Sequence, residues 1–334
     1  MSTTQERDLE KAKDAGDPAI RFSNRQIHVG QMTVGPVLFL AAERARLNAL
    51  QWTAFRVKRL GATVGAELHD IDITKPLAPG ALAEVKQALA EYKVIFFRDQ
   101  PLTADQHIAF AAQFGELELH PFLPGTDGKP ELVRFAKSAE VGGYENAWHH
   151  DVTWREIPSL GAVLHALQVP ETGGDTLFCD MHAAYDGLSE EIKAQIENLE
   201  AEHDFMPSFG VRLTKEKQAE MRLQYPVVHH PVAPRHPVTG RRYLYVNPFF
   251  VTRIVGLSVQ ESEDLIAHLT RQSTYLEYQC RFQWQKDSVA FWDNHAVQHY
   301  AASDYYPDIR IMERASIIGH RPTKKISKQF RRQW

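Results

Sequence analysis

The chain has 334 residues, of which 43% are hydrophobic and 24% are charged, and its formal net charge at pH 7 is −4. This composition is ordinary for a folded, soluble protein, and the length allows one large domain or two smaller ones. The slight negative charge and a pI near 6.5 argue against a general binder of nucleic acids or other polyanions.

Cysteine usage and the N-terminal residues indicate the compartment. Cys179 and Cys280 do not form a CxxC pair, so we expect neither a disulfide framework nor a thiolate metal site. Residues 1–18 are highly charged and lack the apolar core of a secretory signal. The longest apolar stretch that follows, at 34–42, is too short to span a bilayer. We therefore expect a cytoplasmic protein without a membrane partner.

Three segments are expected along the chain. Residues 1–18 are polar and are predicted to form a mobile tail. Residues 19–54 mix short apolar runs with arginines and could form an additional hairpin or arm. Residues 55–334 carry regular apolar patterns and are predicted to form the main domain.

The first part of this domain shows both strand and helix patterns. Residues 55–73 alternate apolar and polar side chains around glycines, which predicts strands joined by tight turns. Residues 79–92 have apolar side chains at helical spacing and predict an amphipathic helix. Residues 93–99 predict a buried strand. Residues 103–115 predict a helix that begins at a threonine N-cap and ends at a glycine.

Short strand-like segments dominate the rest of the chain. They are residues 161–167, 174–180, 241–247, 287–294 and 310–319. Helical inserts are expected between them, at 181–187, 189–198, 214–223 and 258–272. Many short strands separated by turns favour a sandwich or barrel over a doubly wound parallel sheet. We therefore predict a mainly β protein with helical inserts (α+β).

The segment 146–154 contains a candidate metal-binding pattern, in which His149 and His150 are followed by Asp151. In a strand, residues two apart project to the same face, so His149 and Asp151 can converge on one ion while His150 points away. A distant second histidine would complete the triad of two histidines and one carboxylate that is typical of non-haem Fe(II) oxygenases. By itself the HxD pattern is common, and it also suits two partly exposed histidines near a turn.

The segment 291–314 supplies the remaining candidates. It contains His295 and His299, either of which could be the second histidine, and it ends with Arg310 and Arg314. The two arginines are four residues apart on a predicted strand, so both can face one cavity. A guanidinium suits bidentate binding of a carboxylate, such as the remote carboxylate of 2-oxoglutarate. Alternatively, these arginines form salt bridges at the edge of a sheet.

From about Phe55 to Pro322, the chain resembles the TauD/TfdA family of 2-oxoglutarate dioxygenases, and within it the taurine dioxygenases. The run WHHDVTWREIPSLGAVLHALQVPETGGDTLF is similar to the family from its W-H-x-D-V-T-F motif to its G-G-D-T motif. The later segments FVTRIVGLS and WDNHAVQHYAASDYYPDIRIMERASIIG resemble further signatures in the same order. The resemblance implies a double-stranded β-helix core (jelly roll, cupin-like) and the use of Fe(II), 2-oxoglutarate and O₂.

The resemblance also implies which residues hold the iron. It places His149, Asp151 and His299 on the ligand positions, in preference to the neighbouring His150 and His295. A triad of this kind occupies one face of the metal and leaves positions for a bidentate co-substrate and O₂.

Two binding sites for small anions are implied in the same way. Thr176 and Arg310 fall on the positions that bind the remote carboxylate of 2-oxoglutarate. Arg314 and His120 fall on positions that face the anionic group of the substrate. Further substrate-pocket positions fall on Ser208, Phe209, Phe250 and Val152. Without the family resemblance, the aromatic side chains in this set fit an ordinary hydrophobic core equally well.

Three departures from the family pattern concern the substrate pocket. Leu123 stands where taurine dioxygenases carry an aromatic hydroxyl, residues 144–147 replace a polar stretch, and residues 246–250 are VNPFF. These changes make the end of the pocket that would bind an ammonium group more apolar. An ammonium group without polar partners there would cost about 1–3 kcal/mol. We therefore expect a substrate with an anionic sulfonate or sulfate head and a tail less polar than that of taurine.

The resemblance implies hydroxylation of the carbon next to a sulfonate or sulfate group in taurine, an alkanesulfonate or an alkyl sulfate. The products would be an aldehyde and sulfite or sulfate, together with succinate and CO₂. One alternative is the same chemistry on a carboxylate such as an aryloxyalkanoate or an amino acid. Another is a non-redox protein that holds Zn²⁺ in the same triad. We also expect a homo-oligomer, either a dimer or a tetramer, that does not bind nucleic acid.

Overall fold

The computed structural model describes residues 27–29, 32–34, 37–126, 128–143 and 145–325. The chain divides into two units, Met1–Ala41 and Ala42–Trp334. In the first unit, strands β1 (Ile27–Val29) and β2 (Met32–Val34) pair as an antiparallel hairpin. The predicted mobile tail, residues 1–18, lies outside the described residues.

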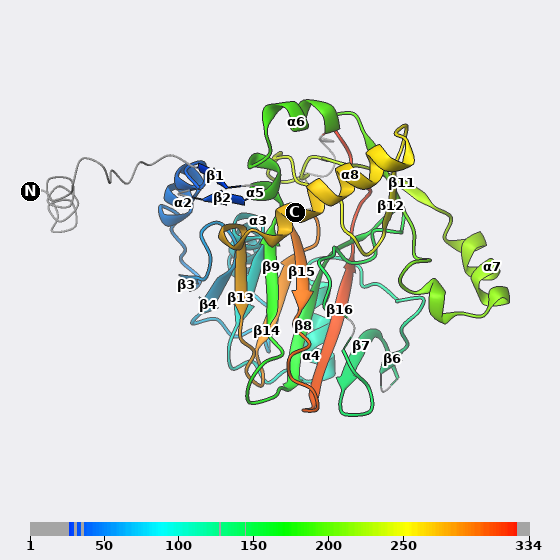
Figure 1. Ribbon diagram of the computed structural model, residues 1–334. Coiled ribbons are helices and arrows are strands. Elements are labelled where there is room, and N and C mark those ends of the chain that lie inside the picture. Colours follow the sequence, from blue (N-terminus) through cyan, green and yellow to red (C-terminus); the bar gives the residue numbers. More distant parts are fainter. Residues whose placement is uncertain (1–26, 30–31, 35–36, 127, 144, 326–334) are drawn as a thin grey trace, which may run out of the picture. The chain divides into compact units, whose positions relative to one another are not determined.

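Helices are spread along the chain between its strands (Figure 1). The α-helices are α2 (Leu40–Asn48), α3 (Pro79–Tyr92), α4 (Ala104–Ala112), α5 (Met181–Asp186), α6 (Glu190–Ile196), α7 (Lys215–Gln224) and α8 (Val259–Thr270). Three short 3₁₀ helices are η1 (Gly210–Arg212), η2 (Arg271–Thr274) and η3 (Leu276–Tyr278). Within the described part of the chain, none of these helices has the length and apolar character needed to cross a membrane.

The described residues of the second unit contain three sheets. The eight-stranded sheet has the order β3 (Arg56–Arg59), β4 (Ala66–His69), β5 (Val94–Phe97), β14 (Val289–Asp293), β8 (Ser159–Gln168), β16 (Arg310–Ile318), β7 (Lys129–Lys137) and β6 (Gly125–Thr126). Its neighbours are antiparallel, except for the parallel pair β4 and β5. The second sheet has the order β13 (Gln279–Phe282), β9 (Thr176–Asp180) and β15 (Val297–Ala301). The third has the order β11 (Val228–Pro231), β10 (Glu200–His203) and β12 (Val251–Ile254).

The central strand β5 of the eight-stranded sheet is buried on both faces, which explains why the sequence of β5 is continuously apolar. Val94 and Phe96 pack in a cluster with side chains of the β13-β9-β15 sheet, which lies against the large sheet (Figure 1). Ile95 and Phe97 point the other way and pack in a second cluster with side chains of α3 and α4. Successive strand residues face opposite sides, so a strand covered on both faces must be apolar throughout. The predicted mainly β sandwich with helical inserts is confirmed.

The predicted helices agree with the structure to within a few residues. The helix predicted at 79–92 has those bounds. The helix predicted at 103–115 is α4, whose N-cap Thr103 forms a capping box with Gln106 and which ends at Ala112. The four predicted inserts correspond to α5, α6, α7 and α8.

The prediction of a strand at 241–247 is wrong. This segment is extended, but its backbone N–H groups donate to different parts of the chain. Leu244 N–H donates to the carbonyl of Met181 and Tyr245 N–H to that of Val232, over 3.1 and 2.9 Å. The run of apolar side chains at 243–246 therefore reflects burial here and not a regular ladder, because no single neighbouring strand accepts these bonds.

Candidate metal centre and active site

Three buried side chains, those of His149, Asp151 and His299, converge on one point. Their possible ligand atoms all lie within 4.8 Å of one another. Oδ1 of Asp151 lies 3.8 Å from Nε2 of His149 and 3.9 Å from Nε2 of His299. Among the described residues, no second group of three or more His, Cys, Asp or Glu side chains is arranged in this way. The structure thus brings together the three residues proposed as ligands from the sequence.

The backbone that carries this triad differs from the expected strand. His149 forms an isolated antiparallel bridge with His299, in which each N–H donates to the carbonyl of the other over 3.1 and 2.9 Å. Asp151 already belongs to a turn, and Val152 after it has a φ of 47°. This left-handed conformation is rare for a β-branched residue. The expectation that strand alternation aligns His149 with Asp151 is therefore wrong, because a strained turn aligns them.

The side chain of Asn294 stabilises this turn by hydrogen bonds to its backbone. Its Oδ1 accepts the backbone N–H of Asp151 over 2.7 Å. Its Nδ2 donates to the carbonyl oxygens of Asp151 and Ser159, over 2.9 and 3.1 Å. All three residues are buried, so these bonds satisfy backbone groups that water cannot reach. The role of Asn294 was not predicted, although it lies in the WDNH segment next to the candidate histidines.

The protonation states in the triad suit a divalent metal. Nδ1 of His149 lies 2.7 Å from the carbonyl of Ala147, so Nδ1 carries a hydrogen, and Nε2 is the nitrogen that faces Asp151. Burial lowers the pKa of His299 to about 3 and keeps its ring neutral. Burial raises the pKa of Asp151, but the charge of the nearby Arg314 opposes it, and this pKa is lowered to about 2. Two imidazoles and a carboxylate are the donor set that a metal of this class requires.

The two competing histidines lie outside the triad. His150 is fully buried against Tyr245, with ring centroids 4.7 Å apart. Nδ1 of His295 lies 2.9 Å from the hydroxyl of Tyr243. Both rings therefore belong to a buried aromatic cluster next to the triad, and neither joins His149 and Asp151 in the metal-binding group.

Two cavities that share wall residues open beside the triad. One is lined by Thr176 and Arg310, the residues expected to bind 2-oxoglutarate, together with His149 and His299. The other has a volume of about 310 Å³. Every residue expected to bind the substrate lines this second cavity: His120, Val152, Ser208, Phe209, Phe250 and Arg314. Arg314 lines both cavities, as expected for a β16 residue four positions from Arg310.

The first cavity has a buried cation in its wall. Nε of Arg310 donates to the carbonyl of Gly174 over 3.1 Å. Nη2 of Arg310 is buried and has no hydrogen-bond partner among the described residues. Burial lowers the pKa of this arginine, which nonetheless stays charged because a guanidinium does not lose its proton in proteins. An anion in the cavity would satisfy the unpaired N–H group.

His120 lines the second cavity, and its Nε2–H can donate a hydrogen bond there. Its Nδ1 accepts the backbone N–H groups of Phe122 and Leu123, over 3.2 and 3.1 Å. The ring hydrogen must therefore reside on Nε2. Burial, followed by the charge of Arg314, lowers the pKa of His120 to about 3. The ring is thus a neutral donor near a permanent cation, and the pair suits an anionic group.

Other residues also line the cavities. Leu123, Glu145 and Phe249 belong to the pocket segments at which the sequence departs from the family pattern, whereas Phe135, Lys137 and Val141 were not predicted. Apolar side chains form much of the second wall: Leu123, Val141, Phe249 and Phe135. Lys137 and Glu145 line both cavities and form an ion pair of 3.0 Å. Phe135 and Lys137 are two apart on β7, so both face the site. No strand was predicted at 129–137, so the alternation that places Phe135 and Lys137 on one face was missed.

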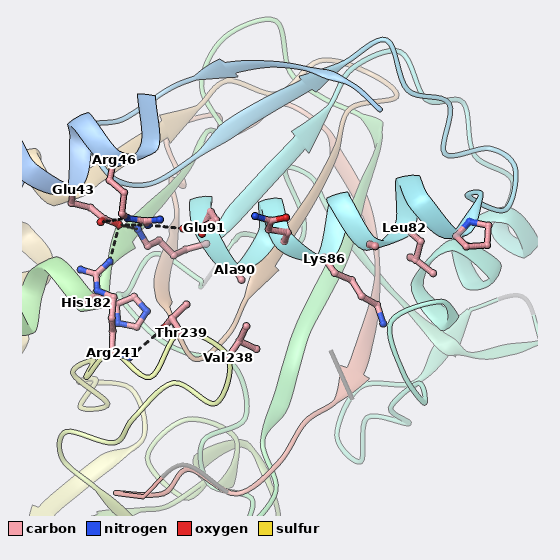
Figure 2. Close-up of a pocket in the computed structure, with 14 residues that line it drawn as sticks. Glu43, Arg46, Leu82, Lys86, Ala90, Glu91, His182, Val238, Thr239 and Arg241 are labelled. Atoms are coloured by element: carbon pink, nitrogen blue, oxygen red, sulfur yellow. Dashed lines mark hydrogen bonds and ion pairs between the residues drawn. The ribbon is translucent and has the colours of Figure 1, made fainter. Parts of the chain in front are cut away.

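A larger cavity, of about 760 Å³, lies away from the triad (Figure 2). No described residue that lines it lines either cavity beside the triad. Its charged side chains pair with one another, as Figure 2 shows for Glu43, which accepts from Arg46 and Arg241 over 2.9 and 2.8 Å. The buried Nζ of Lys93 lies 3.2 Å from Asp180. This region contains an ion-pair network and does not include the triad of His149, Asp151 and His299.

Comparison with known proteins identifies the family. The model of the family described as "Taurine catabolism dioxygenase TauD, TfdA family" matches residues 56–316. This chain belongs to the TauD/TfdA family. Members of this family are 2-oxoglutarate-dependent dioxygenases, so the enzyme uses Fe(II), 2-oxoglutarate and O₂. The alternative of a non-redox zinc protein is therefore set aside.

Relatives in the TauD/TfdA family act on different substrates. An α-ketoglutarate-dependent sulfate ester dioxygenase of Pseudomonas putida is 33% identical over 275 residues, covering 80% of this chain and 90% of the relative. An α-ketoglutarate-dependent 2,4-dichlorophenoxyacetate dioxygenase of Cupriavidus pinatubonensis is 32% identical over 253 residues, covering 70% and 87%. The crystal structure of a taurine dioxygenase from Burkholderia xenovorans has a TM-score of 0.71 and 37% identity, covering 81% and 91%.

Proposed function

We propose that His149, Asp151 and His299 hold the Fe(II) of this dioxygenase, and that the enzyme hydroxylates the carbon next to a sulfonate or sulfate group. With 2-oxoglutarate and O₂, the bound iron supplies the oxidising power that breaks this C–H bond. The protein contributes the geometry. A carbon hydroxylated in this way is unstable, and its collapse releases an aldehyde with sulfite or sulfate.

One contact carries the proposal. Nη1 of Arg314 lies 3.0 Å from Oδ1 of Asp151, so this guanidinium lies directly beside a proposed metal ligand. Nε of Arg314 is buried without a hydrogen-bond partner among the described residues. An anion bound by Arg314 and His120 would therefore lie close to the metal, and the carbon bearing it would be the one nearest the oxidant. Such positioning matters because small displacements of the reacting atoms cost large factors in rate.

Thr176 and Arg310 are proposed to hold the remote carboxylate of 2-oxoglutarate. Both line the cavity that also contains His149 and His299. The unpaired N–H of Arg310 and the hydroxyl of Thr176 can donate to the same carboxylate. With its far end fixed in this way, the keto acid end of the co-substrate points toward the triad.

The apolar wall supports a substrate with a hydrocarbon tail. Leu123, Val152, Phe209, Phe249 and Phe250 line the substrate cavity. An alkyl chain gains about 25 cal/mol for each Å² of apolar surface that it buries there. An ammonium group would instead lose its water, and the Glu145 carboxylate in the wall already pairs with Lys137. Alkyl sulfates and alkanesulfonates are therefore proposed as better substrates than taurine. The 33% sequence identity to a sulfate ester dioxygenase is in keeping with this choice.

A carboxylate substrate is the second candidate, since Arg314 and His120 would also bind a carboxylate. The 32% sequence identity to a 2,4-dichlorophenoxyacetate dioxygenase supports this second candidate. A panel of hexyl sulfate, hexanesulfonate, taurine and 2,4-dichlorophenoxyacetate would separate the candidates. Succinate formation scores turnover, and release of sulfite or sulfate identifies the carbon attacked. Turnover of taurine far above that of the hexyl compounds would contradict the proposal.

The ligand assignment has its own test. His149→Ala and Asp151→Ala are expected to abolish O₂ consumption that depends on 2-oxoglutarate, and to weaken Fe(II) binding measured by equilibrium dialysis at least about 100-fold. His229→Ala is the matched control, because this histidine has 43% of its side chain exposed and is not one of the triad. Undiminished iron binding in either triad variant would refute the assignment.

Assembly as a dimer or tetramer and a cytoplasmic location stay predictions. The cytoplasmic location accords with the proposed function, since a small anionic metabolite and 2-oxoglutarate would have to meet in one compartment. Sedimentation velocity at several protein concentrations would measure the oligomeric state, and a monomer at all of them would contradict that prediction.

A further inference from the structure

We infer that Trp284 is a positioning residue for 2-oxoglutarate, which it serves by orienting the hydroxyl of Thr176. The inference rests on the proposed function, in which Thr176 and Arg310 hold the remote carboxylate of the co-substrate. Trp284 lies between β13 and β14 and belongs to no motif used to recognise the family.

The contact is a buried hydrogen bond. Nε1–H of Trp284 donates to Oγ1 of Thr176 over 2.9 Å. Trp284 and Thr176 are only 5% and 3% exposed, so water does not compete for the bond. An indole nitrogen can only donate, and the hydroxyl oxygen must therefore be the acceptor. The direction of this hydrogen bond follows from chemistry alone.

The consequence for Thr176 concerns its hydrogen. A hydroxyl has one hydrogen and two acceptor lone pairs, and one lone pair is used by Trp284. Among the described residues, none accepts the hydroxyl hydrogen of Thr176 in return. A threonine hydroxyl usually turns to donate to a nearby backbone carbonyl. Here the approaching indole N–H disfavours orientations that point the hydroxyl hydrogen toward it, which leaves this hydrogen available to the cavity that Thr176 lines.

The same indole also lies beside the second proposed anchor. Cζ of Arg310 is 5.9 Å from the ring centroid of Trp284, and it is equally far from that of Tyr305 on another side. An aromatic face at this distance attracts a guanidinium. Trp284 therefore contacts both carboxylate-binding groups, through its N–H in one case and through its ring in the other. The two contributions can be separated, because phenylalanine keeps a ring and lacks the N–H.

The test is a double-mutant cycle on 2-oxoglutarate binding. Trp284→Phe, Thr176→Val and the double variant would be titrated with 2-oxoglutarate by calorimetry, without oxygen and with Fe(II) bound. Trp284→Phe is expected to raise the Kd roughly 3- to 10-fold, the factor that corresponds to about 1 kcal/mol for one hydrogen bond. When Thr176 is already valine, adding Trp284→Phe should change the Kd by less than about twofold, because the hydroxyl that Trp284 orients is absent.

Turnover provides a second readout. With saturating 2-oxoglutarate, kcat of Trp284→Phe should stay within about twofold of the unsubstituted enzyme, while KM for 2-oxoglutarate rises with the Kd. Trp52→Phe is the matched control, because it removes an indole N–H that donates to the Tyr92 hydroxyl over 3.0 Å, far along the chain from Thr176. Trp52→Phe and Trp284→Phe are expected to lose similar amounts of stability, because each loses one indole hydrogen bond. The Kd for 2-oxoglutarate should stay unchanged in Trp52→Phe.

Each outcome decides a different point. If Trp284→Phe leaves the Kd unchanged, or has its full effect without the Thr176 hydroxyl, the inference is overturned. If Thr176→Val itself leaves the Kd unchanged, the proposed co-substrate site fails instead. Should Trp284→Phe not fold, 3-benzothienylalanine at position 284 removes the N–H with almost no change in shape, and the same cycle applies.

Discussion

Arg314 and Asp151 form a buried ion pair, with Nη1 of the arginine 3.0 Å from Oδ1 of the aspartate. The pair links a residue proposed to bind the substrate to one proposed to bind the metal. Four residues earlier on the same strand, Arg310 lines the co-substrate cavity. A single strand, β16, thus carries both of the arginines that are proposed to bind the co-substrate and the substrate.

The two arginines are expected to have opposite kinetic signatures. Arg314→Gln should raise KM for the sulfonate or sulfate substrate at least about 10-fold, because it removes a charge-assisted bond to the anion. Arg310→Gln should raise KM for 2-oxoglutarate by a similar factor. Steady-state kinetics with each ligand varied in turn would measure both constants. A rise in the same constant for both variants would contradict the division of roles.

Asn294→Ala should loosen the turn that carries Asp151. The substitution leaves the N–H of Asp151 and two carbonyls without their partner, so the free energy of unfolding should fall by at least about 2 kcal/mol. Iron affinity should fall as well, because Val152 keeps its strained φ only while the surroundings hold it. Urea unfolding and equilibrium dialysis would measure the two effects. Unchanged iron affinity in Asn294→Ala would contradict this account.

Leu123→Tyr should shift specificity toward taurine. A phenol at this position restores the hydroxyl typical of taurine dioxygenases and places a polar group in an apolar wall. The ratio of kcat/KM for taurine to that for hexyl sulfate should rise roughly 10-fold. Leu119→Tyr is the matched control, because Leu119 is 60% exposed and does not line the cavity. An unchanged ratio in Leu123→Tyr would remove Leu123 from the specificity determinants.

His107 should make stability depend on pH. Burial lowers its pKa in the folded protein to about 4, from 6.5 in the unfolded chain, and its Nε2–H donates to the carbonyl of Val163. The unfolded chain therefore binds a proton first as the pH falls, and stability present above pH 6.5 is lost on the way to pH 4. Between pH 7.5 and 5 the loss due to His107 should be about 2 kcal/mol.

The His107 prediction is checked with His107→Gln, which can still donate to Val163 and does not titrate. Urea unfolding at both pH values should show a smaller loss for this variant than for the unsubstituted protein. An equal loss in both would mean that His107 is not responsible.

Local patterns in the sequence determined much of the fold, and the family resemblance pointed to the triad. The helix at 79–92 and the cap at Thr103 were predicted because apolar spacing and capping depend on residues close in the chain. The order of the family motifs favoured His299 over His295, and the structure places His299 with His149 and Asp151. Side-chain chemistry alone had left both histidines possible.

Only the tertiary structure decided what supports these residues. Asn294 reaches Asp151 across 143 positions of sequence, and Trp284 reaches Thr176 across 108. Such pairs have no fixed spacing, because they depend on which strands become neighbours after folding. The turn at Val152 was hidden for a related reason: its surroundings impose a φ that the residue itself disfavours. The sequence thus names the groups that can bind the metal and the anions, and the packing of distant segments sets the geometry in which they are held.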